Sequence, residues 1–293
     1  MGKRVKIMQK KTIGILLAGV VIVGAIGFAL FNGESNKSKT ITVRSATAKK
    51  MDVTETLSTT GTLIPNETEN LVGTGNVTDL NVKVGDTVEK DQVLATYDSG
   101  LTLKAGIAGT VTEVNIKTGQ PDTAAQQGKA SIVISDLANL KVQLALSNSE
   151  ARQVKVDQKT NISSGGQDYT GKVTEKDPTA TISQGTNGAA TLGAVVTFDD
   201  KPKELYAGFA ADVTITIATE KDALAIPIEA LTYNDKNESI VYEVKDEKAK
   251  ITKVETGIQS DQFIVIKNGI TDGDRVILSP ASNLKDGSSV TKE

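Results

Sequence analysis

The side chains that carry out most enzyme chemistry are missing from this sequence. Its 293 residues contain no His and no Cys. Their absence excludes a Cys/His zinc site, a Ser-His-Asp triad and a thiol nucleophile. Carboxylate metal sites and Ser–Lys pairs remain open on composition, but no spacing in the chain supports either of them. We therefore predict no catalytic residues and a protein that is not an enzyme.

Carboxylates are the remaining type of metal ligand, and they gather in three predicted turns at residues 199–200, 235–238 and 272–274. None of these turns has the D-x-[DN]-x-[DN]-G spacing that ordered calcium loops use. Solvated acidic turns explain them better than calcium sites do. We therefore predict no metal and no cofactor.

Charge is unevenly distributed along the chain, whose formal net charge at pH 7 is −3. Five basic residues precede residue 12, namely Lys3, Arg4, Lys6, Lys10 and Lys11. The rest of the chain therefore carries −8 and has no basic patch. Nucleic-acid binding needs clustered positive charge, so we exclude nucleic acid as a partner.

Residues 12–31 form an uncharged, mostly apolar stretch of 20 residues, which is enough to cross a bilayer core as a helix. The positive-inside rule places residues 1–11 in the cytoplasm and the chain after residue 31 outside. A cleaved signal peptide is the alternative, but its apolar core would be unusually long and no A-x-A site follows. We predict a retained, single-pass anchor in the cell membrane and a flexible linker at residues 32–40.

The rest of the sequence indicates β-structure. Alternating or β-branched runs such as residues 41–43, 132–134 and 213–217 are separated by Gly, Asn and Asp. One helix start stands out, because Ser147 and Glu150 have the spacing of a capping box. We therefore expect a mainly β body with one short helix. The Gly-, Thr- and Ser-rich stretch at residues 163–187 is expected to form long hairpin loops.

Two segments 34 residues apart are near copies of each other. Residues 75–85 have the sequence GNVTDLNVKVG and residues 109–119 have GTVTEVNIKTG, with six of eleven positions identical. A solenoid needs three or more units, so two copies predict one small domain of two halves related by a pseudo-twofold axis. Each copy is expected to be a strand that ends in a turn, where Gly85 or Gly119 supplies a positive φ.

This repeat resembles the biotinyl/lipoyl carrier fold. The segments V-K-V-G-D-T-V-E-K-D-Q-V-L (residues 82–94) and A-G-T-V…G-Q-P (residues 108–121) are similar to its two halves. In those carriers a modified lysine occupies the tip of a hairpin, and the matching position here is Asp98. The nearest lysine, Lys104, is expected within the returning strand as a solvated side chain. A carrier enzyme is therefore a weak alternative.

A carrier-like fold without its lysine, behind a membrane anchor, resembles the membrane fusion proteins, also called periplasmic adaptors, of the hemolysin-secretion and macrolide-efflux type. Residues 135–159 resemble the entry to that family's β-barrel domain, and residues 206–215 resemble the barrel's last strand. Three further segments, 223–231, 254–258 and 269–277, are similar to its membrane-proximal domain. Each motif is weak alone, but five in the family's order form a specific match.

The resemblance implies four divisions of the exported body: first strands of the membrane-proximal and β-barrel domains (41–63), a lipoyl-like barrel-sandwich domain (64–136), a β-barrel domain (137–220) and a membrane-proximal domain (221–293). Many family members insert a long α-helical hairpin at the carrier tip. Here only residues 97–106 link the two halves, which is too few for two antiparallel helices. This departure implies a complex that needs no outer-membrane partner, as in a Gram-positive bacterium.

The function implied by the resemblance is that of an adaptor subunit in an ABC-type exporter of peptides, antibiotics or other amphiphiles. Its expected partners are a permease, an ATPase and further copies of itself in a ring, often of six. The membrane-proximal domain would contact the permease. A membrane-anchored extracellular binding or sensory module, for cell wall or a peptide ligand, remains the alternative from a different class.

Overall fold

The computed structural model describes residues 40–182 and 189–293. Over these residues the chain is mainly β, as predicted, with one α-helix, α1 (Asn148–Gln153), and two 3-10 turns, η1 (Ala125–Gln127) and η2 (Ile228–Ala230). No helix within these two ranges is long and apolar enough to cross a bilayer. The predicted membrane segment at residues 12–31 lies outside the described residues.

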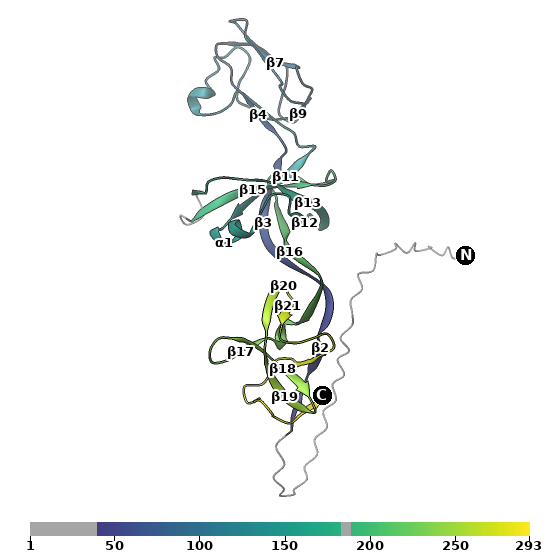
Figure 1. The fold of residues 1–293 in the computed structure, drawn as a ribbon. Helices are drawn as coiled ribbons and strands as arrows, with labels where there is room; N and C mark the ends of the chain where they lie inside the picture. Colours follow the sequence, from purple (N-terminus) through teal and green to yellow (C-terminus); the bar gives the residue numbers. More distant parts are fainter. Residues whose placement is uncertain (1–39, 183–188) are drawn as a thin grey trace, which may run out of the picture.

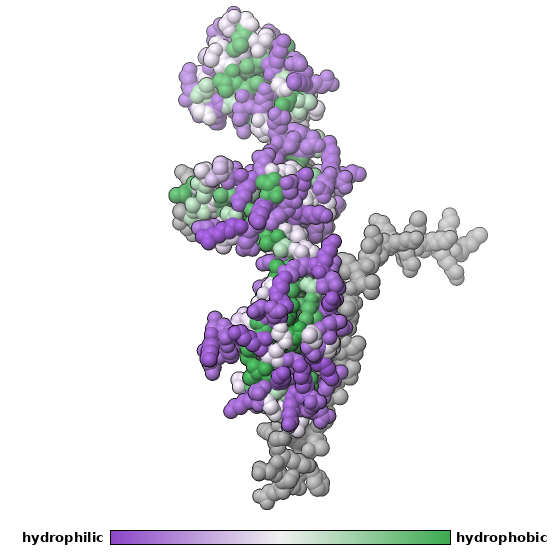
Figure 2. All heavy atoms as spheres, in the orientation of Figure 1, coloured by the Kyte–Doolittle hydropathy of each residue, from purple (hydrophilic) through white to green (hydrophobic). Residues whose placement is uncertain are grey.

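Three β-bodies stand end to end and make the molecule elongated (Figure 1). A carrier-fold domain (residues 68–135) lies at one end and a barrel in the middle. The third body, here called the base domain, combines residues 41–53 with residues 223–293. The visible surface is largely hydrophilic, with apolar side chains gathered within each body (Figure 2). Each body has an apolar core of its own.

The middle body is a closed six-stranded barrel. Its strands pair in the order β12-β13-β15-β11-β3-β16, and β12 pairs back with β16 to close the ring. Residues alternate between the interior and the outer face, as expected for a small filled barrel. The strands are β3 (Lys49–Pro65), β11 (Leu140–Leu146), β12 (Lys159–Ser164), β13 (Gln167–Lys176), β15 (Ala190–Phe198) and β16 (Ala210–Pro227), with the short β14 (Thr181–Ile182) beside β15.

The expectation of long loops at residues 163–187 is wrong for most of that stretch. Strand β13 occupies ten of these residues and pairs with both β12 and β15. Along β13 the residues Gln167, Asp168, Thr170 and Lys172 are exposed, while Gly171 and Val173 are buried. Position within a barrel wall, where only alternate residues need be apolar, therefore overrides a loop-like composition.

Helix α1 begins as the sequence predicts. The Ser147 side chain accepts a hydrogen bond from the Glu150 backbone N–H, and the Glu150 carboxylate accepts one from the Ser147 N–H at 2.7 Å. At the other end, the Lys176 ammonium donates to the carbonyls of Ala151 and Val154. A cation at helix-terminal carbonyls is favourable. Both ends of this short helix are thus satisfied, and Val154 is fully buried in the barrel core.

The carrier-fold domain consists of two small sheets, with strand orders β4-β10-β9-β6 and β5-β7-β8. Strands of one sequence half pair with strands of the other, since β4 pairs with β10 and β7 pairs with β8. The strands are β4 (Thr68–Leu71), β5 (Val77–Leu80), β6 (Thr87–Val88), β7 (Val93–Tyr97), β8 (Thr102–Lys104), β9 (Gly109–Val114) and β10 (Ile132–Ser135).

Reciprocal hydrogen bonds confirm the predicted pseudo-twofold relation between the two halves. The Gly85 N–H donates to the Val111 carbonyl at 2.9 Å, and the Gly119 N–H donates to the Val77 carbonyl at 2.8 Å. Each of these residues is 34 positions from its counterpart. Gly85 and Gly119 have φ values of +94° and +76°, as the turn reasoning predicts. The repeat therefore encodes two interlocked copies of one strand-and-turn unit.

The base domain joins the two ends of the described chain. Strand β1 pairs in parallel with β23, and β2 pairs with β22, so the N-terminal strands complete sheets made by the C-terminal ones. The strands are β1 (Ile41–Val43), β2 (Ser45–Thr47), β17 (Thr232–Tyr233), β18 (Ser239–Lys245), β19 (Lys248–Lys253), β20 (Glu255–Gln259), β21 (Phe263–Asn268), β22 (Arg275–Ile277) and β23 (Val290–Lys292).

Two long strands connect the barrel to the base domain. β3 and β16 pair with each other from Thr62 and Ala210 to Lys49 and Ala225, so one ribbon belongs to both bodies. The carrier-fold domain is joined to the barrel by two short links, residues 66–67 and 136–139. These links hydrogen-bond to each other, since Asn66 N–H donates to the Asn139 carbonyl at 2.8 Å.

A buried tyrosine holds the long loop of the carrier-fold domain. The Tyr97 hydroxyl donates to Asp122 Oδ2 at 2.8 Å, and the Ser131 hydroxyl donates to the same oxygen at 2.6 Å. Ser131 Oγ in turn accepts from the Gly73 N–H at 2.9 Å. Burial raises the pKa of Tyr97 above its ordinary value of 10.0, and the hydrogen bond to Asp122 raises it further. This network ties the loop at Asp122 to strand β7 and to Gly73.

The first prediction concerns the two turn glycines. A Cβ atom at Gly85 or Gly119 would meet no other atom within 4 Å, so only the backbone conformation opposes alanine there. Gly85→Ala and Gly119→Ala should each lower the free energy of unfolding by about 1–2 kcal/mol, which is the cost of a left-handed L-residue. Urea unfolding measures this, with Thr118→Ala as control. Strongly unequal costs would contradict the pseudo-twofold relation.

The second prediction is a pH dependence carried by Tyr97. Its folded pKa is raised, so its contribution to stability is complete below the unfolded pKa near 10 and is lost as pH rises above it. Tyr97→Phe should cost about 1 kcal/mol at pH 8, through the lost hydrogen bond. The difference from wild type should shrink at pH 11. Urea unfolding at both pH values measures it, with the exposed Tyr206→Phe as control. If the difference in unfolding free energy between wild type and Tyr97→Phe were the same at both pH values, Tyr97 would not be the source of the pH dependence.

Candidate functional site

The tip of the carrier-fold domain is a four-residue turn between β7 and β8. The Tyr97 N–H donates to the Leu101 carbonyl at 2.9 Å, and the Gly100 N–H donates to the Tyr97 carbonyl at 2.9 Å. Asp98, Ser99, Gly100 and Leu101 are all exposed at this turn. The link between the halves is thus even shorter than residues 97–106, because Thr102–Lys104 already form the returning strand.

Asp98 lies at this tip and is tied to the start of the repeat. Its Oδ2 accepts from Asn76 Nδ2 at 2.8 Å, its Oδ1 accepts from the Asn76 N–H at 3.2 Å, and its own N–H donates to the Asn76 carbonyl at 3.0 Å. The Asn76 amide, side chain first and backbone second, holds the pKa of Asp98 below its ordinary value. The geometry gives Asp98 a role in closing the turn. Its equivalence to the carrier lysine stays a prediction.

Lys104 lies within β8 opposite Val93, with its side chain exposed, which confirms the predicted position in the returning strand. Two residues of β8, Thr102 and Leu103, separate Lys104 from the turn that contains Asp98. The sequence alone did not point to Asn76 as the partner of Asp98. The signal that could have suggested it is the Gly75-Asn76 pair, a typical turn sequence, and Gly75 does have a φ of +103°.

In two of the three acidic turns a carboxylate accepts hydrogen bonds from a nearby residue of the same turn region. Asp274 Oδ2 accepts from the Thr271 N–H at 2.7 Å and from the Thr271 hydroxyl at 2.9 Å, which holds the pKa of Asp274 below its ordinary value. The Asn234 side chain likewise donates to Glu238 at 2.8 Å. Across residues 40–182 and 189–293, no group of three or more acidic residues is arranged to hold a metal ion.

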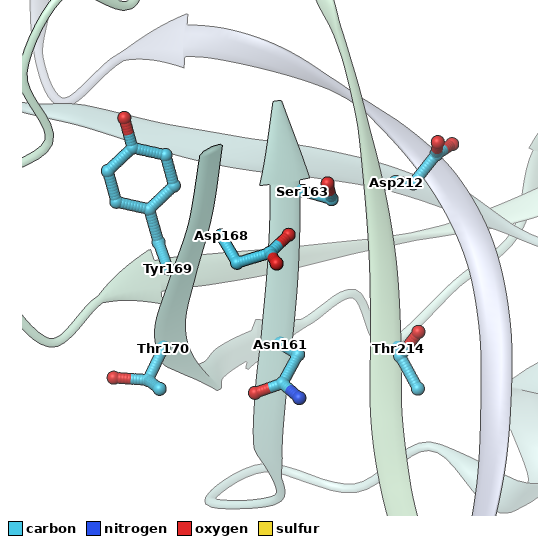
Figure 3. A pocket seen from close by; sticks show the side chains of 7 residues that line it. All are labelled: Asn161, Ser163, Asp168, Tyr169, Thr170, Asp212 and Thr214. Atoms are coloured by element: carbon cyan, nitrogen blue, oxygen red, sulfur yellow. The ribbon is translucent and has the colours of Figure 1, made fainter. Parts of the chain in front are cut away.

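A groove of about 340 Å³ lies on the outer wall of the barrel (Figure 3). Every side chain that lines it carries a polar group, and sequence reasoning missed the groove because these residues lie on three strands. Asp168 and Asp212 lie on either side of Ser163, which is the cross-strand partner of both. Asp212 accepts from the Thr60 hydroxyl at 3.0 Å. The lining residues are Asn161, Ser163, Asp168, Tyr169, Thr170, Asp212 and Thr214.

Another cavity of about 210 Å³ lies in the base domain, beside β1. At its rim Arg44 and Glu229 form an ion pair at 2.8 Å, and the Ser279 hydroxyl donates to the same Glu229 oxygen at 2.9 Å. Ser279 has a φ of +45°, which is unusual for a residue with a side chain. These contacts link Arg44, which directly follows β1, to Glu229 in η2 and to Ser279 in the loop after β22. The wall includes Ile41, Val43, Ile277, Leu278, Pro280 and Leu284.

Comparison with known domain families gives two matches. The barrel-sandwich hybrid domain of YknX matches residues 72–135, and the C-terminal permuted SH3-like domain of YknX matches residues 223–292. The first confirms the predicted barrel-sandwich fold of the carrier-like domain. Together they cover one domain at each end of the elongated body.

Two curated relatives are informative. YknX of Bacillus subtilis (strain 168), named as a component of an efflux system, is 32% identical over 209 residues, which are 68% of this chain and 54% of that protein. The multidrug resistance protein MdtA of Xenorhabdus bovienii is 28% identical over 101 residues, or 34% of this chain and 24% of that protein. The chain thus spans about half the length of YknX and about a quarter of MdtA.

Two solved structures share the fold. MacA from Actinobacillus actinomycetemcomitans superimposes with a TM-score of 0.68 at 17% identity, covering 80% of this chain and 99% of that one. A MacA–MexA chimera with the Pseudomonas aeruginosa MexA α-hairpin domain gives 0.64 at 19% identity, covering 79% and 99%. The domain matches and the relation to YknX identify the chain as a homologue of YknX, and its fold is the one that the two MacA-type structures share.

Proposed function

We propose that this chain is an extracytoplasmic adaptor of an ABC-type efflux complex, held in the cell membrane by residues 12–31. The observation that carries the proposal is the pair of YknX domain matches at the two ends of one elongated body. Such a body is suited to contact a transporter at one end and to organise an exit path with the rest. The relation to proteins named for efflux and multidrug resistance supports the same role.

The base domain is the proposed contact for the permease. It contains Ile41, the first residue of β1, which directly follows the predicted linker at residues 32–40. An anchor ahead of that linker keeps the base domain nearer the membrane than the barrel or the carrier-fold domain. This arrangement supports the proposed boundaries 64–136, 137–220 and 221–293 as functional units, with residues 41–63 shared between two of them.

The remaining parts of the proposal concern partners. The complex would include a permease, an ATPase and several copies of this chain, with carrier-fold domains side by side in a ring, six being the number that the family resemblance implies. The cargo would be peptides, antibiotics or other amphiphiles.

The short tip at Asp98 offers no hairpin for an outer-membrane channel, which favours a Gram-positive cell. The role is non-catalytic, in keeping with a sequence that has no His and no Cys.

An adaptor of this kind acts on transport through binding energy. It changes the transport cycle only if it binds one conformation of the permease more tightly than another. A preference of 1.4 kcal/mol shifts that equilibrium about tenfold. The ribbon of β3 and β16 ties the base domain to the barrel, so a contact at the permease also constrains the position of the barrel.

The third prediction locates the permease contact. A photo-crosslinking residue placed at Tyr233, which is 58% exposed on the base domain, should give an adduct with a multi-span membrane protein in cells that express the full chain. The same residue at Leu101, which is 40% exposed at the carrier-fold tip, should not. Mass spectrometry of the adducts identifies the partner.

Two outcomes would contradict the proposal. Adducts with the permease from Leu101 and none from Tyr233, nor from the exposed Ile251 on the neighbouring hairpin, would reverse the orientation of the molecule. Adducts from all three positions with sensor kinases or cell-wall proteins, and none with a transporter, would instead favour the extracellular binding module.

A further inference from the structure

The barrel and the base domain meet through a single two-stranded ribbon. In the described part of the chain, every strand pairing that links the two bodies involves β3 or β16. Near the barrel each of these strands has a second neighbour, β11 or β12, and near the base domain β16 pairs with β21. Between these regions, at residues 53–56 and 216–220, the two strands pair only with each other.

The register of the ribbon changes twice within this short region. Thr216 pairs with Thr56, but the next pair is Ala218 with Glu55, so β16 contains one extra residue there. From the pair of Glu220 and Val53 to the pair of Ala223 and Met51, β16 again advances by one residue more than β3. These are two one-residue β-bulges on the same strand, and each locally bends the strand and increases its twist.

The two bulges compensate each other. Side chains alternate between the faces of a strand, so one extra residue transfers every later side chain to the opposite face. Val213 and Ile215 of β16 face the barrel core, and Ala225 of the same strand faces the core of the base domain beside Val53 and Val265. With two extra residues in β16, the side chains beyond the second bulge return to the face they would have occupied in a strand without bulges. The bulges therefore bend the ribbon while both cores remain filled.

Specific contacts hold both bulges in place. Ile217, the extra residue of the first bulge, packs against the barrel core. At the second bulge Asp222 has a φ of +47°, its N–H donates to Asp52 Oδ1 at 3.0 Å, and its carboxylate lies 3.4 Å from Lys50 Nζ. The first bulge is thus attached to the barrel and the second to β3 at the edge of the base domain.

Between the two bulges, Glu220 of the ribbon forms an ion pair with Lys267 of the base domain. Thr54 and Thr219 are hydrogen-bonded across the ribbon at 3.3 Å. Of the residues between the two bulges, Val53 packs into the base domain with Ala225 and Val265, while the pairs on its barrel side contact mainly each other. Two-stranded ribbons twist more strongly than wider sheets do, so the local backbone geometry here decides how the two bodies are oriented.

We propose that the paired bulges of β16 set the resting angle between the barrel and the base domain, and that the ribbon between them is the joint about which the two bodies rotate. Each bulge adds bend and twist to the ribbon. The second bulge cancels the change of face that the first one causes, so both bulges are compatible with filled cores. A base domain held by a partner would thereby fix the direction in which the barrel and the carrier-fold domain project. The inference rests on strand register and holds whichever partner binds the base domain.

The test removes both extra residues from the full chain. Because the sequence has no Cys, spin labels can be placed by Thr170→Cys on the barrel and Lys285→Cys on the base domain. Deleting Ile217 and Asp222 together keeps the alternation and straightens the ribbon. Pulsed electron paramagnetic resonance should then show a mean distance shifted by more than the width of the wild-type distribution. Labels at Lys236 and Lys285, both in the base domain, should keep their distance.

Single-residue variants make the test independent of that deletion. Asp222→Val places a β-branched residue where φ is positive, which is strongly unfavourable, while Lys221→Val changes the exposed neighbour without that conflict. Asp222→Val should shift or broaden the barrel-to-base distance, and Lys221→Val should leave it unchanged. Deletion of Ile217 alone should lower the unfolding midpoint far more than the double deletion does. Wild-type distances in both the double deletion and Asp222→Val would overturn the proposal.

Discussion

Backbone pairing between β3 and β16 is the constraint on which the rest of the structure depends. The pairing extends over almost the whole of both strands, and two different bodies are assembled on its two ends. Buried backbone N–H and C=O groups must be paired, so each body adds strands where the ribbon's outer edges would otherwise be open. The barrel closes on one end through β11 and β12, and the base domain adds β21 at the other.

Turns and helix ends of this fold can be predicted from the sequence, but the pairing of strands that are far apart in the chain cannot. The internal repeat correctly predicts the pseudo-twofold carrier-fold domain and the positive φ of Gly85 and Gly119, because a repeated turn must have the same backbone conformation twice. The capping box at Ser147 and Glu150 correctly predicts where α1 begins. Both features depend on residues close together in the chain.

What the sequence does not reveal depends on partners far away in the chain. The continuity of β3 from the base domain into the barrel is hidden, because residues 49–65 show no change in composition where the domain changes. The outer groove of the barrel is hidden for the same reason, since Asp168 and Asp212 are 44 positions apart and meet only across β12. The hydrogen bonds between Asp98 and Asn76 likewise link residues from opposite ends of one half-repeat.

The pairing of β1 with β23 has a mechanical consequence. The two strands are parallel, and the N–H groups of Ile41 and Glu293 donate across the junction to Ser289 and Val43. Any pull on the chain ahead of Ile41, directed along β1, acts perpendicular to these hydrogen bonds and loads them together in shear. Such an arrangement resists force better than a hairpin that opens one bond at a time. The C-terminal strand β23 thus holds the first described strand, β1, against such a pull.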